Sequence, residues 1–271
     1  MSFLKEIVLI TIGITISIII FGILYDIYYI IKCNYTIKEI EKNHKSKIVF
    51  IKDIDNKIID RLFILFFPNT VISINDNNRL RTILHNNPNN RIIFLIKTIG
   101  GYISSSDSML NLINNHKPLT SCYIPEYAMS AGTLFALACK KIYMNKYAVI
   151  GPTDPQISVC KEYISFNTLS KLIENKPISF IKDKILLNYY ETKILYDENI
   201  MLVKKYIHQH IKDNQNRKII AENEIERLIA TLSYGNIPHH TEININDIQH
   251  IINVNNNIPT DIMKVYNLLN L

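Results

Sequence analysis

The chain has 271 residues and a mass of 31.5 kDa, which is enough for one large domain and an appendage. A hydrophobic content of 48% and a charged content of 20% exclude a chain that is disordered throughout. The formal net charge of +6 comes from lysines scattered among acidic residues rather than gathered in one basic stripe, so the sequence predicts no nucleic-acid partner.

The first segment in chain order is a long apolar stretch. From Ile7 to Tyr25 no residue is charged, and the length is close to the roughly 20 residues that cross a bilayer as a helix. A cleaved signal peptide would have a shorter apolar core and a small-residue cleavage site. The sequence therefore predicts an uncleaved, single-pass transmembrane anchor over residues 1–29.

The lysines around this stretch indicate its orientation. Only Lys5 precedes the span, whereas four lysines follow it closely, Lys32, Lys38, Lys42 and Lys45. The excess of positive charge after the span predicts that the rest of the chain faces the cytoplasm. Large domains can be translocated regardless of nearby charge, so the opposite orientation stays open. Residues 30–46 are polar and charged and are predicted to form a stalk, followed by one domain over residues 47–271.

Beyond the stalk, short β-branched runs alternate with helical patterns. Near-continuous apolar strands separated by helices predict an α/β fold with a mostly parallel sheet that is covered on both faces. The expected strands are residues 47–51, 70–74, 91–96, 121–124 and 148–150, and the expected helices are residues 77–85, 104–115 and 131–140.

The second half of the domain has a different pattern. Apolar residues recur at helical spacing over residues 182–212, and a second helix is expected over residues 219–233. After Gly235 the density of apolar residues falls, which predicts a loop followed by short helices. We expect this half to form a helical subdomain.

The cysteines indicate neither a metal site nor a disulfide. The chain has no C-x-x-C pair and no histidine at zinc-ligand spacing, and no cofactor is predicted. Cys122 and Cys139 fall in an apolar strand and an apolar helix, where free thiols act as small core hydrophobes.

Glycine is scarce, with seven in the chain, yet two adjacent glycines follow a predicted strand in Lys97-Thr98-Ile99-Gly100-Gly101. Two glycines allow a sharp turn and expose backbone N–H groups, which is how an oxyanion is bound. A plain strand-to-helix turn has the same pattern, and the pair by itself does not distinguish the two.

A second segment, residues 127–133, places Ser130 among small residues at the start of an apolar helix. The free N–H groups and dipole of a helix N-terminus favour negative charge, which suits a nucleophilic serine. Serine is also a common N-cap, so this pattern leaves a purely structural role open.

The segment from residue 92 to residue 156 closely resembles the serine dehydrogenase proteinase family. Members are membrane-anchored and similar to signal peptide peptidase A within the Clp protease/crotonase superfamily. The most specific matches are residues 127–133 and Gly151-Pro152-Thr153-Asp154-Pro155-Gln156, which resembles the family's GP-x-DPQ turn. The resemblance implies a spiral ββα fold and homo-oligomers that enclose the active sites.

The same resemblance assigns roles to individual residues. It implies that Ser130 is the nucleophile and that Gly100 and Gly101 form the oxyanion hole, to which Ala131 would add an N–H group. The family pattern at the glycines resembles H-T-P-G-G, whereas this chain has Lys97 for the histidine and Ile99 for the proline. Without the proline we expect a looser turn.

The general base is less clear from the sequence. The signal-peptidase branch implies a lysine, which must be partly buried so that its amine is neutral. Lys193 matches a lysine in the family's long helix, while Lys171 and Lys184 are alternatives. His239 is a fourth candidate, by analogy with Ser-His-Asp peptidases. Asp154 is expected to shape its turn by hydrogen bonds.

These inferences predict a serine endopeptidase that needs no cofactor, acts on a peptide or protein, and binds extended substrate along a strand edge after Gly101. Two alternatives remain. A crotonase-type acyl-thioester enzyme would have an acidic residue at the reacting carbon and a basic coenzyme-binding loop, which the sequence does not indicate. A catalytically silent oligomeric scaffold at the membrane is the other.

Overall fold

The computed structural model of the chain describes residues 2–52, 76–101, 106–159, 162–213 and 220–269. In chain order its elements are α1 (Ser2–His44), β1 (Ser46–Lys52), α3 (Asp76–Asn86), β2 (Arg91–Lys97), α4 (Ser106–Asn115), β3 (Thr120–Ile124), β4 (Tyr127–Ala128), α5 (Ala131–Ala138), β5 (Lys141–Met144), β6 (Val149–Ile150), β7 (Gln156–Val159), β8 (Glu162–Ser165), α6 (Phe166–Glu174), the 3₁₀ helix η2 (Ile178–Phe180), α7 (Asp183–Asp213), α8 (Glu222–Ser233), β9 (Ile243–Asn244), α9 (Ile245–Ile248), β10 (Val254–Asn255) and α10 (Thr260–Leu269).

The main sheet has five strands in the order β1-β2-β3-β5-β10, and every neighbouring pair is parallel. A smaller sheet joins β4, β6 and β9, with β4 parallel to β6 and β9 antiparallel. The predicted α/β class with a parallel sheet is confirmed. The strand expected over residues 70–74 lies outside the described residues.

Both faces of the main sheet are covered, as β2 illustrates. Its five consecutive buried residues alternate between two hydrophobic clusters. Ile92, Phe94 and Ile96 pack with α3, α4 and α5, whereas Ile93 and Leu95 pack with α1 and α10. A strand that is buried on both sides needs apolar residues at every position, which explains the unbroken run in the sequence.

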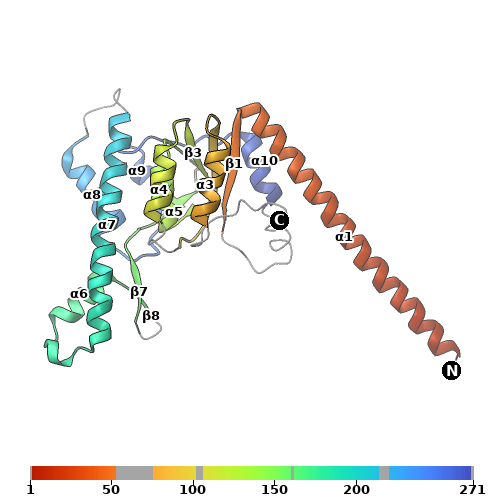
Figure 1. Ribbon diagram of the computed structural model, residues 1–271, viewed down its shortest axis with the longest axis horizontal. Coiled ribbons are helices and arrows are strands. Elements are labelled where there is room, and N and C mark those ends of the chain that lie inside the picture. The colour runs from red at the N-terminus through yellow and green to blue at the C-terminus, as the bar shows by residue number, and fades with distance from the viewer. Residues whose placement is uncertain (1, 53–75, 102–105, 160–161, 214–219, 270–271) are drawn as a thin grey trace.

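Helix α1 projects from the body of the molecule as one continuous rod (Figure 1). Within the described part of the chain it is the one helix long and apolar enough to cross a membrane, judged by length and composition. Residues 30–46, expected as a stalk, are mostly the C-terminal end of this helix. Cys33, Ile37 and Ile40 are buried there against β1 and α10, because they recur on one helix face.

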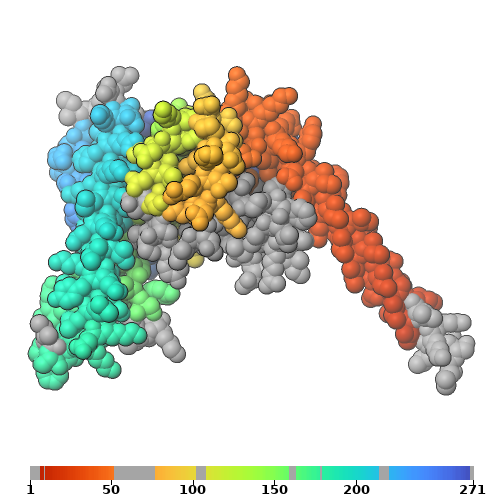
Figure 2. All heavy atoms as spheres, viewed as in Figure 1, coloured from red at the N-terminus to blue at the C-terminus, as the bar shows by residue number. Residues whose placement is uncertain are grey.

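The helical subdomain is also present. α7 covers the predicted segment from residue 182 to 212 within one residue at each end, and α8 follows it. The N-terminal half of α7 projects with α6 and the antiparallel β7–β8 hairpin on the side of the molecule away from α1 (Figures 1 and 2). The sequence did not indicate α6, this hairpin or β5.

Candidate active site

Ser130 lies between β4 and α5 in an unusual backbone conformation. Its φ of 51° and ψ of −118° are strained for a residue with a side chain. Among the described non-glycine residues, Lys45 is the other one with positive φ. Ser130 occupies the N-cap position of α5, but its side chain makes no capping hydrogen bond. The Ser130 hydroxyl therefore does not cap α5, which was the structural role that the sequence left open.

The glycine turn lies directly against this serine. Thr98 forms a parallel bridge with Ala128, and the Met129 N–H donates to the Thr98 carbonyl at 2.9 Å. Gly100 follows with a φ of 122°, and a Cβ atom there would lie 2.7 Å from the Ser130 Cβ and 3.3 Å from its Oγ. Only glycine allows this approach, so the structure brings the two predicted motifs together.

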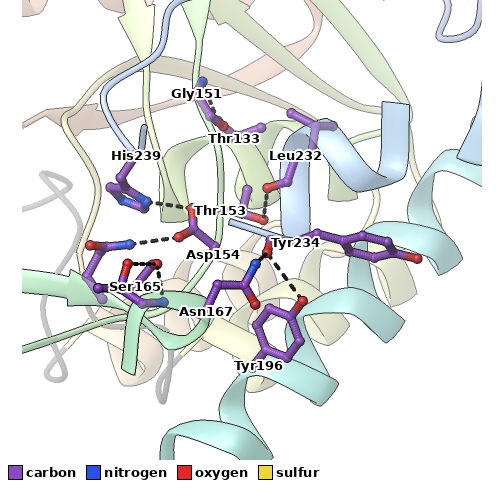
Figure 3. A network of polar contacts seen from close by, with 12 residues as sticks. Thr133, Gly151, Thr153, Asp154, Ser165, Asn167, Tyr196, Leu232, Tyr234 and His239 are labelled. Carbon is purple, nitrogen blue, oxygen red and sulfur yellow. Dashed lines mark hydrogen bonds and ion pairs between the residues drawn. The ribbon is translucent and has the colours of Figure 1, made fainter. Parts of the chain in front are cut away.

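The buried Thr133 side chain forms hydrogen bonds with the segment that precedes Ser130. The Thr133 Oγ1 lies 2.8 Å from the carbonyl oxygens of both Ala128 and Gly151. It also accepts a hydrogen bond from the Gly151 N–H at 3.1 Å (Figure 3). Gly132 is needed beside it because a Cβ atom would lie 2.6 Å from the Thr98 Cγ2. These contacts fix the strand before Ser130 relative to the turn at Gly151.

Asp154 forms the centre of a second polar cluster. It is 1% exposed, and its two carboxylate oxygens lie 2.8 Å from the His239 Nδ1 and 2.7 Å from the Gln156 Nε2 (Figure 3). The neighbouring Thr153 donates to the Leu232 carbonyl from both its N–H and its hydroxyl. The predicted role of Asp154 in shaping this turn agrees with the hydrogen bonds, which also attach the tail at His239.

Asn167 and Tyr196, which the sequence did not single out, hold the segment from Tyr234 to His239 that follows α8. The Asn167 Nδ2 donates to the Tyr234 carbonyl and, at 3.1 Å, to the Asn236 Oδ1, and the Tyr196 hydroxyl donates to the Tyr234 carbonyl at 3.3 Å. Burial is the main reason that the pKa of Tyr196 is raised. No local pattern marks these residues, because their partners lie far away in the sequence.

The candidate lysines are less enclosed than a catalytic base requires. Lys171 on α6 and Lys184 and Lys193 on α7 are all exposed in the single chain. Among the described residues, no hydrogen bond or ion pair joins any of them to Ser130. Lys193 lies one helical turn before Tyr196, which contacts the tail near Asp154. The lysine prediction therefore gains no support from burial within one subunit.

Two further expectations concern what the site would bind. The described residues contain no group of three His, Cys, Asp or Glu side chains that could hold a metal ion. The strand edge expected to bind substrate starts after Gly101, which is itself exposed, and residues 102–105 lie outside the described residues.

A serine at a helix start beside a glycine turn offers a hydroxyl and backbone N–H groups, a combination that suits nucleophilic acyl transfer. A family described as ClpP-like SDH-type serine proteinase matches the chain over residues 1–271. The chain belongs to this family. The resemblance seen in the sequence is confirmed, and with it the ClpP-like α/β fold.

The chain is similar to two uncharacterized proteins of Methanocaldococcus jannaschii. It is 28% identical to protein MJ1495 over 253 residues, which cover 90% of this chain and 77% of the relative. It is also 28% identical to protein MJ0137 over 202 residues, which cover 74% of this chain and 65% of that relative.

Solved structures similar to the SDH-type chain include two mutants of the 1510-N membrane-bound stomatin-specific protease, one of them in complex with a substrate peptide. Each covers 82% of this chain. The first has a TM-score of 0.46 at 15% identity and is itself 84% covered. The peptide complex has a TM-score of 0.38 at 17% identity and is itself 96% covered.

Proposed function

We propose that the chain is a membrane-anchored serine endopeptidase in which Ser130 attacks the carbonyl carbon of a peptide bond. The observation that carries this proposal is the contact between Gly100 and Ser130, with the serine held at positive φ and its hydroxyl not used as a cap. Backbone strain of this kind persists only where the surroundings enforce it, and it clusters at active sites. Membership of a serine proteinase family supports a peptide substrate.

The oxyanion of the tetrahedral intermediate would lie between the backbone N–H groups of Gly101 and Ala131. Ala131 is the first residue of α5, and the first four N–H groups of a helix have no partner within the helix. Gly101 adjoins the residue that contacts Ser130. Two such donors stabilise the charge that develops as the serine oxygen bonds to the carbonyl carbon.

Lys193 is the proposed general base, which takes the proton of the Ser130 hydroxyl. A lysine acts as a base only as the neutral amine, and burial favours that form over the ammonium. Because Lys193 is exposed in the single chain, the proposal requires a second subunit or the substrate to cover it. This requirement agrees with the homo-oligomer implied by the sequence resemblance. Lys171 and Lys184 would need the same covering.

His239 is the second candidate base, and a specific contact favours it. When the Nδ1–H donates to the buried carboxylate of Asp154, the Nε2 becomes the acceptor that a base needs. The side chain is 29% exposed, so this nitrogen can be reached without a second subunit. The lysine and histidine proposals therefore differ in whether catalysis depends on association.

The exposed apolar part of α1 supports a membrane anchor. Its large apolar residues from Ile7 to Tyr28 are about half or more exposed, which is stable in a lipid environment and not in water. We place the peptidase domain on the cytoplasmic side, on the charge bias around the span. Protease protection in sealed vesicles that contain the protein tests the cytoplasmic location. Digestion of the domain in inside-out vesicles alone would support that location. Digestion in right-side-out vesicles alone would contradict it.

Labelling with a fluorophosphonate probe tests the nucleophile. The full-length protein in detergent or vesicles is treated with the probe beside a Ser130→Ala variant, and the adduct is located by mass spectrometry. We expect an adduct on Ser130 that the variant lacks. If neither protein is labelled, the scaffold alternative replaces the peptidase proposal. Labelled protein that hydrolyses thioesters but no peptide would favour the crotonase-type alternative.

The same assay identifies the base. Lys193→Met, Lys171→Met, Lys184→Met and His239→Gln are compared for their labelling rate, since loss of a general base slows the reaction by about 10²- to 10⁴-fold. We expect Lys193→Met to be the slow variant. A slow His239→Gln variant beside three unaffected lysine variants would reject the lysine mechanism.

A further inference from the structure

Lys97 lies where the glycine turn leaves the main sheet. It is the last residue of β2, and its Nζ lies 2.7 Å from the Glu126 Oε2. Glu126 directly precedes β4, which leads to Ser130. The ion pair therefore joins the two segments just before Thr98 and Ala128 bridge, at the point where the oxyanion turn and the nucleophile segment diverge from the sheet.

Two aromatic rings enclose the Lys97 ammonium. The Nζ lies 5.8 Å from the ring centroid of Tyr127 and 5.7 Å from that of Tyr266, within the range at which a cation is attracted to a ring face. Burial by itself lowers the pKa of Lys97, but hydrogen bonding to Glu126 and Tyr266 outweighs it and raises the pKa. The side chain is thus held as a cation while being only 23% exposed.

Tyr266 connects this cluster to the C-terminal helix. It is 7% exposed and lies on α10, which packs against both α1 and the sheet. The His44 Nε2 at the end of α1 lies 2.6 Å from the Asp261 Oδ2 of α10, and the Tyr29 hydroxyl donates to the Leu268 carbonyl. α10 lies beside β1 and the near end of α1 (Figure 1). The lysine therefore contacts an element that is fixed at both ends.

We propose that Lys97 is a positioning residue that holds the Gly100-Gly101 turn against Ser130, by joining the end of β2 to Glu126 and to Tyr266 on α10. This rests on the proposed function, because the turn's role in binding the oxyanion is part of it. The contacts of Lys97 with Glu126 and Tyr266 restrain the backbone of the turn, which its own sequence does little to restrain. Ile99 stands where the family pattern has proline, and it is 71% exposed, so its own packing adds little.

The test combines a chemical readout with one that needs no activity. Full-length wild type, Lys97→Met and Lys97→Arg are compared for the rate of fluorophosphonate labelling and for hydrogen exchange at Thr98 and Gly100, whose N–H groups bond to Tyr127 and to Thr98. Lys204→Met is the matched control, because it removes a lysine–glutamate pair between α7 and α8, far along the chain from the turn.

We expect Lys97→Met to label Ser130 roughly 10- to 100-fold more slowly, since small displacements of a catalytic group have effects of this size. Its Thr98 and Gly100 amides should exchange faster while the amides of α7 do not. Lys97→Arg, which keeps the cation, should recover most of the labelling rate, and Lys204→Met should behave as wild type. If Lys97→Met does not fold, Tyr266→Leu serves instead, with the same expected local change.

The outcomes separate this proposal from the one on which it rests. If no protein labels but the turn amides exchange faster in Lys97→Met alone, the positioning role stands and the peptidase proposal fails. If wild type labels and Lys97→Met matches it in both readouts, the positioning role is rejected and the nucleophile stands. Equal losses in Lys97→Met and Lys97→Arg would also overturn it, because the cation would then be irrelevant.

Discussion

Gly100→Ala is the sharpest single test of the candidate site. The added Cβ would lie 2.7 Å from the Ser130 Cβ and 3.2 Å from the Met129 carbonyl oxygen, at a φ of 122° that side chains rarely adopt. The backbone strain costs about 1 to 3 kcal/mol and the overpacking a similar amount. For a domain of this size, each 1 kcal/mol lowers Tm by roughly 2 to 4 °C. We expect Tm to fall by about 5 °C or more.

The effect on chemistry should be larger than the effect on stability. If the turn forms the proposed oxyanion hole, its displacement removes a donor to the oxyanion, which slows acyl transfer by about 10²- to 10³-fold. The rate of fluorophosphonate labelling at Ser130 and thermal unfolding measure the two effects. Gly22→Ala is the control, since, apart from its chain neighbours and the backbone of its own helix, no atom of the described residues lies within 4 Å of its Cβ position. A Gly100→Ala protein with the labelling rate and Tm of wild type would show that the contact does not exist.

Three further perturbations probe other parts of the fold. Burial lowers the pKa of His210, whose Nε2 lies 2.9 Å from the Leu137 carbonyl oxygen, below its ordinary 6.5. The unfolded chain therefore binds more protons as pH falls below 6.5, so Tm should decline from pH 7.5 to 5, and a His210→Gln variant with an equally steep decline would contradict this. Gly235 has a φ of 62°, and a Cβ atom there would lie 2.9 Å from the Asp154 Oδ2, so Gly235→Ala should lower Tm by several degrees. Gly235→Asn should lower Tm by less, because Asn tolerates positive φ. Equal losses of Tm in the two variants would exclude a backbone cause. Deletion of residues 2–28 should abolish flotation with lipid vesicles while leaving Tm of the domain unchanged, and loss of folding would show that the exposed part of α1 is structural.

Most of the sheet and of the paired motifs followed from local sequence. An unbroken apolar run such as residues 92–96 has few structural explanations other than a strand buried on both faces. Gly100 and Ser130 were recognisable because glycine is rare in this chain and each motif follows a strand. That the two motifs share one site was implied by the family resemblance and not by the strand pattern, and the structure brings Gly100 against Ser130.

The remainder depended on contacts between distant segments. Polar residues around Cys33, Ile37 and Ile40 suggested a solvated stalk, although their spacing of four and three places them on one helix face. Lys97 was visible only as a departure from a family pattern, because Tyr266 is remote in the sequence. The choice of Lys193 over the other lysines stays a prediction, because sequence carries no direct record of burial and α7 exposes Lys193 in one subunit.

If the chain is the proposed membrane-anchored peptidase, the continuity of α1 limits which proteins it can cut. The helix runs without glycine or proline from Ile23 to His44, so the part between the apolar stretch and the sheet lacks the two residue types at which helices most often kink. Cys33, the first residue of α1 to be buried in the domain, lies about 12 Å along the axis from Tyr25, at a rise of about 1.5 Å per residue. In a membrane the helix would hold Ser130 at a fixed distance from the bilayer surface. Cleavage would then favour chains that present an extended segment close to the lipid surface.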